Sequence, residues 1–196
     1  KLEKIYKNFS VSKFEPEFFW SGILDAMKIK LNIKKISDDE IPNSGSLLMI
    51  ANHPFGIIDG LILCSIASKV RSDFKIMTHE TLRFLPELEK FILPVDFNDT
   101  SKESIKNNLN TAIKAKEHIN SGGLLIIFPS GSVSTAKNLK SAAEDDDWKL
   151  FPAKIIHQTK TNVLPIYFNG KNGLLFHLFA SKLKNQTLDN LPEDLQ

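Results

Sequence analysis

Cysteine is nearly absent from this sequence, which contains only Cys64, inside an apolar stretch. A single cysteine cannot form an internal disulfide or a redox pair, and it cannot supply a metal cluster. The five histidines also lack a metal-ligand spacing such as His-Glu-x-x-His. We therefore expect a buried structural thiol, in keeping with a reducing compartment, and neither a metal nor a prosthetic cofactor.

The sequence also lacks a hydrophobic run long enough to cross a bilayer, which takes about 20 apolar residues. The longest candidate, residues 49–67, is interrupted by Asn52, His53 and Asp59. No signal-peptide pattern is present, although the chain begins at Lys1 rather than at a methionine. These absences favour a soluble or membrane-peripheral protein.

Charge of one sign is not in excess, because 25 Lys and Arg face 23 Asp and Glu, for a net charge of +2. Nucleic-acid binding requires a basic stripe or a recognised module, so we expect no nucleic-acid partner. Lysines do concentrate within residues 1–35. This cluster has two interpretations, a solvated surface or a cationic face near anionic lipid.

The composition that remains is that of a globular protein, with 42% hydrophobic and 24% charged residues. Short apolar runs predict strands at residues 46–51, 74–78, 92–97, 124–128 and 162–168. Helical patterns cover residues 14–31, 60–70, 82–91, 100–121 and 154–159, the fourth with a capping box of Thr100 and Glu103. This alternation predicts an α/β fold with a mixed, largely parallel sheet flanked by helices.

The chain has no linker long enough to separate two domains, so we interpret residues 1–196 as a single domain. Residues 1–35 would form a helical N-terminal segment, residues 36–180 the core, and residues 181–196 a C-terminal extension that is open to truncation. The N-terminal helix, residues 14–31, has an amphipathic pattern. Its apolar side chains fit either packing against the sheet or a membrane interface.

Residues 52–60, Asn-His-Pro-Phe-Gly-Ile-Ile-Asp-Gly, carry the most functional information. They connect a predicted strand to a predicted helix, at the strand end where open α/β sheets bind ligands. A carboxylate close to an imidazole fixes its tautomer and stabilises its protonated form. His53 is therefore a candidate general base, and Asp59 is the group that would orient it.

Two further strand-to-turn junctions are expected at the same edge of the sheet. Residues 128–134 read Phe-Pro-Ser-Gly-Ser-Val-Ser, and residues 169–173 read Asn-Gly-Lys-Asn-Gly. Turns at equivalent strand ends converge on one crevice, so the three junctions make a coherent site. The candidate substrate-binding residues are Asn52, Gly56, Ser130, Gly131, Ser132, Ser134 and Lys171.

Two other polar features are weaker. The acidic run at residues 144–147 is assigned to a solvated loop or a helix start. Among the remaining histidines, His79 follows a strand and is placed to reach the crevice. His118, His157 and His177 lie in helical patterns, where a histidine is more often a surface or satisfied core residue.

The three junctions, taken in order, resemble the glycerolipid acyltransferase superfamily. The matching features are the pair His53 and Asp59, the loop at residues 128–134 and the strand at residues 163–166. The extra residue between His53 and Asp59, and the stretch at residues 164–178, are similar to the hemolysin-like branch. The resemblance covers roughly residues 35–180.

This resemblance implies transfer of a fatty acyl group from an acyl thioester, either acyl-CoA or acyl carrier protein, to a hydroxyl of a lysolipid. His53 would remove the hydroxyl proton, and Asp59 would orient His53. Donors at residues 129–134 would neutralise the oxyanion or hold a headgroup, although turn formation alone explains these serines equally well. The resemblance also implies a bacterial protein of lipid biosynthesis, peripheral on the cytoplasmic face of the membrane.

Some positions depart from the superfamily pattern. The usual Glu and Arg of the loop are replaced by Ser130 and Val133, and residues 95–98 lack the Arg that usually binds acceptor phosphate. Without the guanidinium fork, an amino-acid lysolipid of the lyso-ornithine or lyso-glycine type fits better than glycerol phosphate. Other candidate phosphate ligands are Lys75, Arg83 and Lys171.

Two other functions stay open. A serine hydrolase would use Ser130 with His53 and Asp59, although the Gly-x-Ser-x-Gly elbow is absent. A non-catalytic lipid-binding domain would keep the fold without the chemistry, and the presence of both His53 and Asp59 argues against it. A nucleotide-binding enzyme is weaker still, because nothing matches the phosphate loop Gly-x4-Gly-Lys-Ser/Thr.

Overall fold

A computed structural model describes residues 16–34, 41–79, 86–96, 101–136 and 141–173. Within these residues one sheet contains β1 (Leu47–Ala51), β2 (Phe74–His79), β3 (Ile92–Val95), β4 (Leu124–Ile127) and β5 (Asn162–Ile166). The strand order is β3-β2-β4-β1-β5, and every pair of neighbours is parallel. The predicted α/β class is therefore confirmed.

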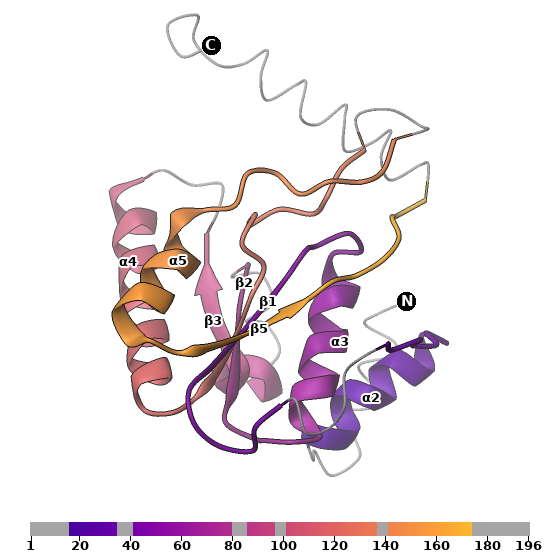
Figure 1. Cartoon of the computed structure of the whole chain (residues 1–196), viewed down its shortest axis with the longest axis horizontal. Coiled ribbons are helices and arrows are strands. Elements are labelled where there is room, and N and C mark those ends of the chain that lie inside the picture. Colours follow the sequence, from indigo (N-terminus) through magenta and orange to yellow (C-terminus); the bar gives the residue numbers. More distant parts are fainter. Residues whose placement is uncertain (1–15, 35–40, 80–85, 97–100, 137–140, 174–196) are drawn as a thin grey trace, which may run out of the picture.

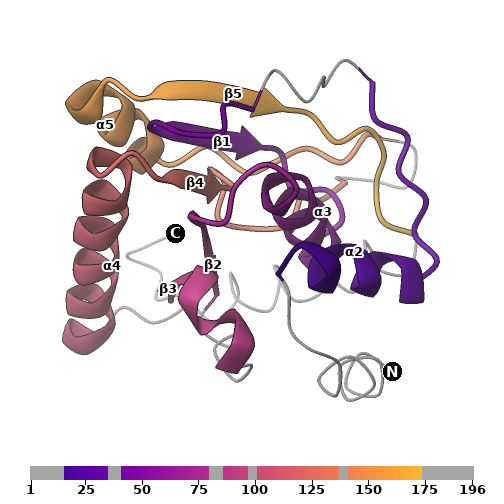
Figure 2. The same cartoon turned by 90° about the horizontal axis from the view of Figure 1, so that it is seen from below.

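Helices cover both faces of this sheet (Figures 1 and 2). They are α2 (Pro16–Ala26), α3 (Ile57–Ser68), α4 (Lys102–Asn120) and α5 (Leu150–Thr159), with a 3-10 helix, η3 (Pro86–Phe91), before β3. Met49 of β1 packs in one core with α2 and α3, whereas its neighbour Leu48 packs in a second core with α4 and α5. Successive strand residues point to opposite faces, so both faces need a helical layer.

The central strand β4 shows why the strands read as continuous apolar runs. All four of its residues are buried, because β1 and β2 flank it and helices cover both of its faces. The edge strand β5 pairs only with β1 among the described strands, and no residue in it is fully buried. Burial thus follows the position of each strand in the sheet.

The chain reverses direction across the sheet between β1 and β4. β1 leads into α3 on one face, and its neighbour β4 leads towards α5 on the other face. The connections that follow these two strands therefore run to opposite faces of the sheet. This topological switch point is where α/β sheets of this kind bind ligands.

At the opposite side of the sheet, where the strands begin (the amino edge), the buried side chain of Arg71 joins several segments. Its guanidinium donates to both oxygens of Asp73, each at 2.6 Å. It also donates to the carbonyls of Pro42, Gly45 and Gly122 at 3.2, 2.8 and 2.6 Å. These partners precede β1, β2 and β4, so one side chain hydrogen-bonds to the segments that lead into three strands.

Several element predictions need adjustment. The cap of α4 is Ser101, whose side chain accepts from the Ser104 N–H at 3.1 Å, and not Thr100, which lies outside the described residues. The segment expected to be helical near residue 86 is a 3-10 helix. The N-terminal fifteen residues, Arg83 and everything after residue 173, including His177, also lie outside the described part. The division into segments at residues 35 and 180 stays a prediction.

The N-terminal helix α2 packs largely against the rest of the protein. Phe19, Trp20 and Ile23 are buried, whereas Phe18 is 66% exposed. Trp20 makes edge-to-face contacts with the rings of Phe74 and Phe91. Most of the apolar cluster thus serves the core, and none of the described helices is long and apolar enough to span a membrane.

Candidate functional site

The motif at residues 52–60 places its imidazole against its carboxylate. Asp59 lies in the first turn of α3 and is completely buried. Its Oδ2 lies 3.1 Å from His53 Nδ1 and also accepts the Phe55 N–H at 2.8 Å. A carboxylate only accepts hydrogen bonds, so Nδ1 carries the proton and Nε2 is left as a proton acceptor. The side chain of His53 is 17% exposed and can be reached from solvent.

Gly56 makes the tight turn between these two residues possible. Its φ of 66° is in the left-handed region, which favours glycine. A Cβ there would lie 3.3 Å from Val133 Cγ2, so the turn also packs closely on the loop after β4. Asp59 N–H donates to the Gly56 carbonyl at 2.9 Å. Gly56 therefore shapes the backbone of the site.

The loop after β4 meets the motif at Phe128. The Phe128 ring stacks on the imidazole of His53, with centroids 3.9 Å apart and planes 24° apart. The N–H of Ser134, further along the same loop, donates to the carbonyl of His53 at 2.9 Å. The imidazole is thus held at its edge by Asp59 and on its face by Phe128, at the switch point of the sheet.

The turn after β5 joins the same site through Asn52. The Asn52 amide donates to the Phe168 carbonyl at 2.9 Å and accepts the Phe168 N–H at 2.7 Å. Asn172 donates to the Pro54 carbonyl at 2.8 Å. The three predicted junctions do lie together, and Asn52 joins two of them. Its amide is used within the protein.

The loop serines are also engaged within the protein. Ser130 is buried and donates to the carbonyl of Ser132 at 2.8 Å. Ser132 donates to Asp146 at 2.6 Å, and Ser134 donates to Asp145. These bonds shape the loop, which agrees with the turn-forming explanation of the serines. Gly131 lies in the same turn with a φ of 72°.

Lys171 is accounted for in the same way. Its ammonium donates to the carbonyl of Ser141 at 2.7 Å, which joins the turn after β5 to the loop that contains the acidic run. The described contact is therefore structural, and a substrate-binding role for Lys171 stays a prediction.

The acidic run at residues 144–147, predicted to be a solvated loop or a helix start, is a loop with Glu144 and Asp147 exposed, but Asp145 is engaged at the site. Asp145 accepts the His53 N–H at 3.1 Å, the Ser134 hydroxyl and the Trp148 indole N–H at 3.0 Å. Thr135 and Glu144 pair in an antiparallel bridge, which folds the loop back over the motif. Sequence reasoning missed Asp145 because its partner His53 is 92 positions away.

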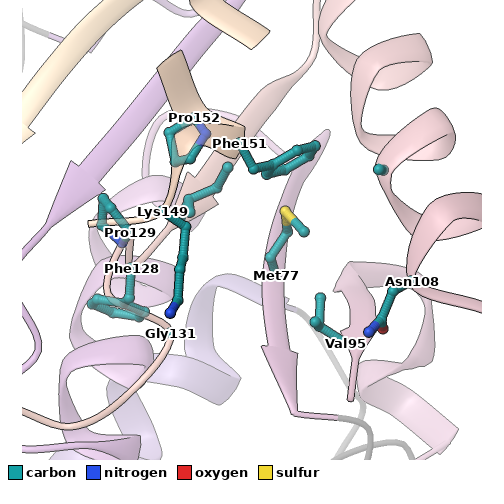
Figure 3. Close-up of a pocket in the computed structure, with 11 residues that line it drawn as sticks. Met77, Val95, Asn108, Phe128, Pro129, Gly131, Lys149, Phe151 and Pro152 are labelled. Atoms are coloured by element: carbon teal, nitrogen blue, oxygen red, sulfur yellow. The ribbon is translucent and has the colours of Figure 1, made fainter. Parts of the chain in front are cut away.

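Phe128 also lines a cavity of about 230 Å³ (Figure 3). Its walls come from the ends of β2, β3 and β4 and from α4 and α5, with the side chains of Met77, Val95, Phe128, Lys149, Phe151 and Pro152. Asn108 also lines it, but its amide pairs with the backbone of Asp96. The cavity is therefore largely apolar and shares the Phe128 ring with the imidazole of His53.

The remaining titratable candidates lie apart from the motif. His118 binds the Leu124 carbonyl at 3.0 Å at the amino end of β4, and burial lowers its pKa. Lys75, also with a pKa lowered by burial, donates to the Lys90 carbonyl at 2.8 Å. Burial raises the pKa of the Cys64 thiol. Within the described ranges, no group of His, Cys, Asp or Glu could hold a metal ion.

Comparison with known proteins is consistent with this geometry. Residues 32–169 match the protein family described as Acyltransferase. A lyso-glycine lipid O-acyltransferase from Phocaeicola vulgatus is 24% identical over 168 residues, which are 85% of this chain and 56% of the relative. One from Bacteroides thetaiotaomicron is 26% identical over 182 residues, 92% of this chain and 62% of the relative. The chain thus spans 56% to 62% of the length of these curated relatives.

Proposed function

Because the chain belongs to the acyltransferase family, we propose that it moves a fatty acyl group from an acyl thioester to a hydroxyl of a lysolipid. The observation that carries this proposal is the 3.1 Å contact between His53 and Asp59 at the switch point of the sheet. An apolar cavity lined in part by the same Phe128 ring supports an acyl substrate. The names of the two relatives support a glycine lipid as the acceptor.

His53 is the general base of the proposed reaction. Its Nε2 takes the proton from the acceptor hydroxyl, and the hydroxyl oxygen attacks the carbonyl carbon of the thioester. The tetrahedral intermediate then collapses, so that a C–O bond has formed and the C–S bond breaks. The leaving thiolate recovers the proton from the imidazolium, which Asp59 stabilises while it exists.

The oxyanion of that intermediate needs hydrogen-bond donors. In the described part of the loop after β4, the N–H groups of Gly131 and Ser134 are used by the carbonyls of Phe128 and His53. Those of Ser132 and Val133 have no such partner among the described residues, which makes them the donors that we assign to the oxyanion. Val133 also lies beside the motif turn, in contact range of Gly56.

A lysolipid acceptor places the reaction at a membrane surface. We assign the protein to the cytoplasmic face, as a peripheral protein of a bacterium, because acyl-CoA and acyl carrier protein are intracellular donors. Both donors carry a phosphate on their pantetheine arm. Lys149 lines the cavity and offers a cation to that phosphate.

The hydrolase alternative is disfavoured by the position of Ser130. A serine nucleophile must donate its hydroxyl hydrogen bond to the general base. Ser130 instead is buried and donates to the Ser132 carbonyl. A covalent acyl-serine intermediate therefore has no support in the described geometry. Direct transfer from donor to acceptor needs no such intermediate.

The test is an acylation assay with lyso-glycine lipid as the acceptor and palmitoyl-CoA or palmitoyl acyl carrier protein as the donor. Mass spectrometry of the lipids should show a gain of one palmitoyl group on the acceptor hydroxyl. With palmitoyl-CoA, a thiol reagent follows the release of the free thiol, and the only cysteine, Cys64, is buried and adds little background.

Two outcomes would contradict the proposal. Release of free palmitate that is unchanged by the acceptor would indicate a hydrolase. A palmitoyl adduct on Ser130 in the intact mass, obtained without acceptor, would replace direct transfer with a covalent route. A Ser130→Ala variant provides the matched control for that adduct.

A further inference from the structure

The main chain of His53 is held by the loop that follows β4. Its N–H donates to Asp145 Oδ1 at 3.1 Å, and its carbonyl accepts the Ser134 N–H at 2.9 Å. The same Asp145 oxygen accepts the Ser134 hydroxyl, while Oδ2 accepts the Trp148 indole N–H at 3.0 Å. One carboxylate thus joins the base, the loop and the start of α5.

His53 needs these partners because it lies just beyond the sheet. The pairing of β1 with β4 ends at Ile50, and its pairing with β5 ends at Ala51. The polar groups of the next residues would otherwise be left to water or unpaired. Thr135 and Glu144 exchange two hydrogen bonds of 3.0 Å, which closes the loop and places the following Asp145 against His53.

We propose that Asp145 is a positioning residue of the acyl-transfer site. Its carboxylate fixes the main chain of His53 relative to the loop after β4, and so fixes the imidazole over Phe128. This inference rests on the proposed function of His53. Asp59 holds the ring by its edge, whereas Asp145 holds the backbone that carries the ring.

The charge of Asp145 matters as well as its shape. Hydrogen bonds to a carboxylate are roughly twice as strong as bonds between neutral groups. An asparagine in its place could accept through one oxygen only and would turn an N–H₂ group towards His53 or Trp148. A general base that moves by about 1 Å can lose about 100-fold in rate, so a small shift of this backbone is costly.

The first test compares Asp145→Ala with Asp147→Asn, which removes a charge from an exposed neighbour in the same loop. Asp145→Ala should lower kcat about 10- to 100-fold and leave the KM for lyso-glycine lipid and for palmitoyl-CoA within about 2-fold. The kcat of Asp145→Asn should lie between that of Asp145→Ala and that of the wild type. Asp147→Asn should match the wild type in both constants.

The second test observes the imidazole directly. A proton on His53 Nδ1 that is shared with Asp59 should give a downfield resonance in the proton NMR spectrum, absent from His53→Ala. This resonance should broaden or move in Asp145→Ala and stay in place in Asp147→Asn. A purely structural role would lower the melting temperature without changing the resonance or the kcat of the folded protein.

The outcomes separate the two proposals. Wild-type kcat and an unchanged resonance in folded Asp145→Ala would overturn the positioning role alone. Full acyl transfer by His53→Ala would overturn the proposed function instead. In that case the resonance still decides whether Asp145 positions the imidazole.

Discussion

The amino edge of the sheet, where the strands begin, and the carboxyl edge, where they end, hold polar networks that differ in how fully their hydrogen bonds are satisfied. At the amino edge, Arg71 donates to both oxygens of Asp73 and to three main-chain carbonyls. At the carboxyl edge, Asp59 is equally buried, yet its Oδ1 has no hydrogen-bond partner among the described residues, and its neighbour His53 is partly exposed. The donors of Arg71 are all hydrogen-bonded, whereas Asp59 keeps an oxygen without a partner, in a site that adjoins a cavity.

This difference separates stability from chemistry within one fold. A buried arginine whose donors are all used holds strand entrances in place and offers little to a ligand. A buried carboxylate that holds an accessible imidazole costs stability, but it keeps a proton acceptor ready at the switch point. We therefore expect substitutions at the amino edge to change the free energy of unfolding, and those at the carboxyl edge to change the rate.

Asp59→Asn should lower the rate strongly without loss of stability. The amide can accept from Nδ1 or donate to it, so the imidazole loses its fixed tautomer, and kcat should fall about 10³-fold. The free energy of unfolding should stay the same or rise by up to about 1 kcal/mol, because a buried charge has been removed. Urea unfolding beside steady-state kinetics checks both; a variant that is strongly destabilised would contradict the contrast between the edges.

Arg71→Ala should have the reverse profile. The carbonyls of Pro42, Gly45 and Gly122 lose a donor, and the free energy of unfolding should fall by about 3 kcal/mol. The kcat of the folded fraction should match the wild type, since Arg71 lies at the far edge of the sheet. The measurement is urea unfolding with activity corrected for folded protein. A loss of kcat larger than the loss of folded protein would show that the edges are coupled.

Gly56→Ala should affect both properties moderately. A left-handed φ costs a non-glycine residue about 1–2 kcal/mol, and the new Cβ would meet Val133. Because this turn sets the approach of His53 to Asp59, kcat should also fall, by about 10-fold. Gly45→Ala is a matched control, since its φ of 87° is also positive but no atom lies within 4 Å of the added Cβ. Equal kcat in the two variants would contradict this role of the turn.

The smallest expected effect concerns pH at the amino edge. The hydrogen bond from Arg71 lowers the pKa of Asp73 from its ordinary value of 3.8. A carboxyl with a lowered pKa stabilises the fold above its unfolded pKa, and this stabilisation is lost as pH falls below about 4 through the folded pKa. Unfolding free energies measured from pH 7 to 3 should converge for wild type and Asp73→Asn at the acid end. A constant difference between them would contradict this linkage.

The sequence contained enough to predict the sheet and the place of the site. Every residue of the run 124–128 is apolar because β4 is the central strand and is covered on both faces. His53 and Asp59 could be paired because one short turn separates them, and the polar turns at residues 129–134 and 169–173 follow strands of the same sheet. Local patterns and the rules of parallel sheets suffice for these features.

Other features depend on contacts that no local pattern encodes. The acidic run at residues 144–147 is predicted to be a solvated loop or a helix start, and the antiparallel bridge of Thr135 and Glu144 helps to bring Asp145 to His53. Three of the partners of Arg71 are likewise main-chain carbonyls, which carry no sequence signal. The sequence predicts the cap of α4 one residue too early, at Thr100, because threonine and serine can both cap a helix.

The most direct test of the central claim is the kcat of His53→Ala, with lyso-glycine lipid and palmitoyl-CoA, beside that of His157→Ala, an exposed histidine on α5. Loss of a general base should lower kcat by about 10²- to 10⁴-fold in His53→Ala while its free energy of unfolding stays within about 1 kcal/mol of wild type. His157→Ala should behave as wild type in both respects. Acyl transfer by folded His53→Ala at the wild-type rate would contradict the account.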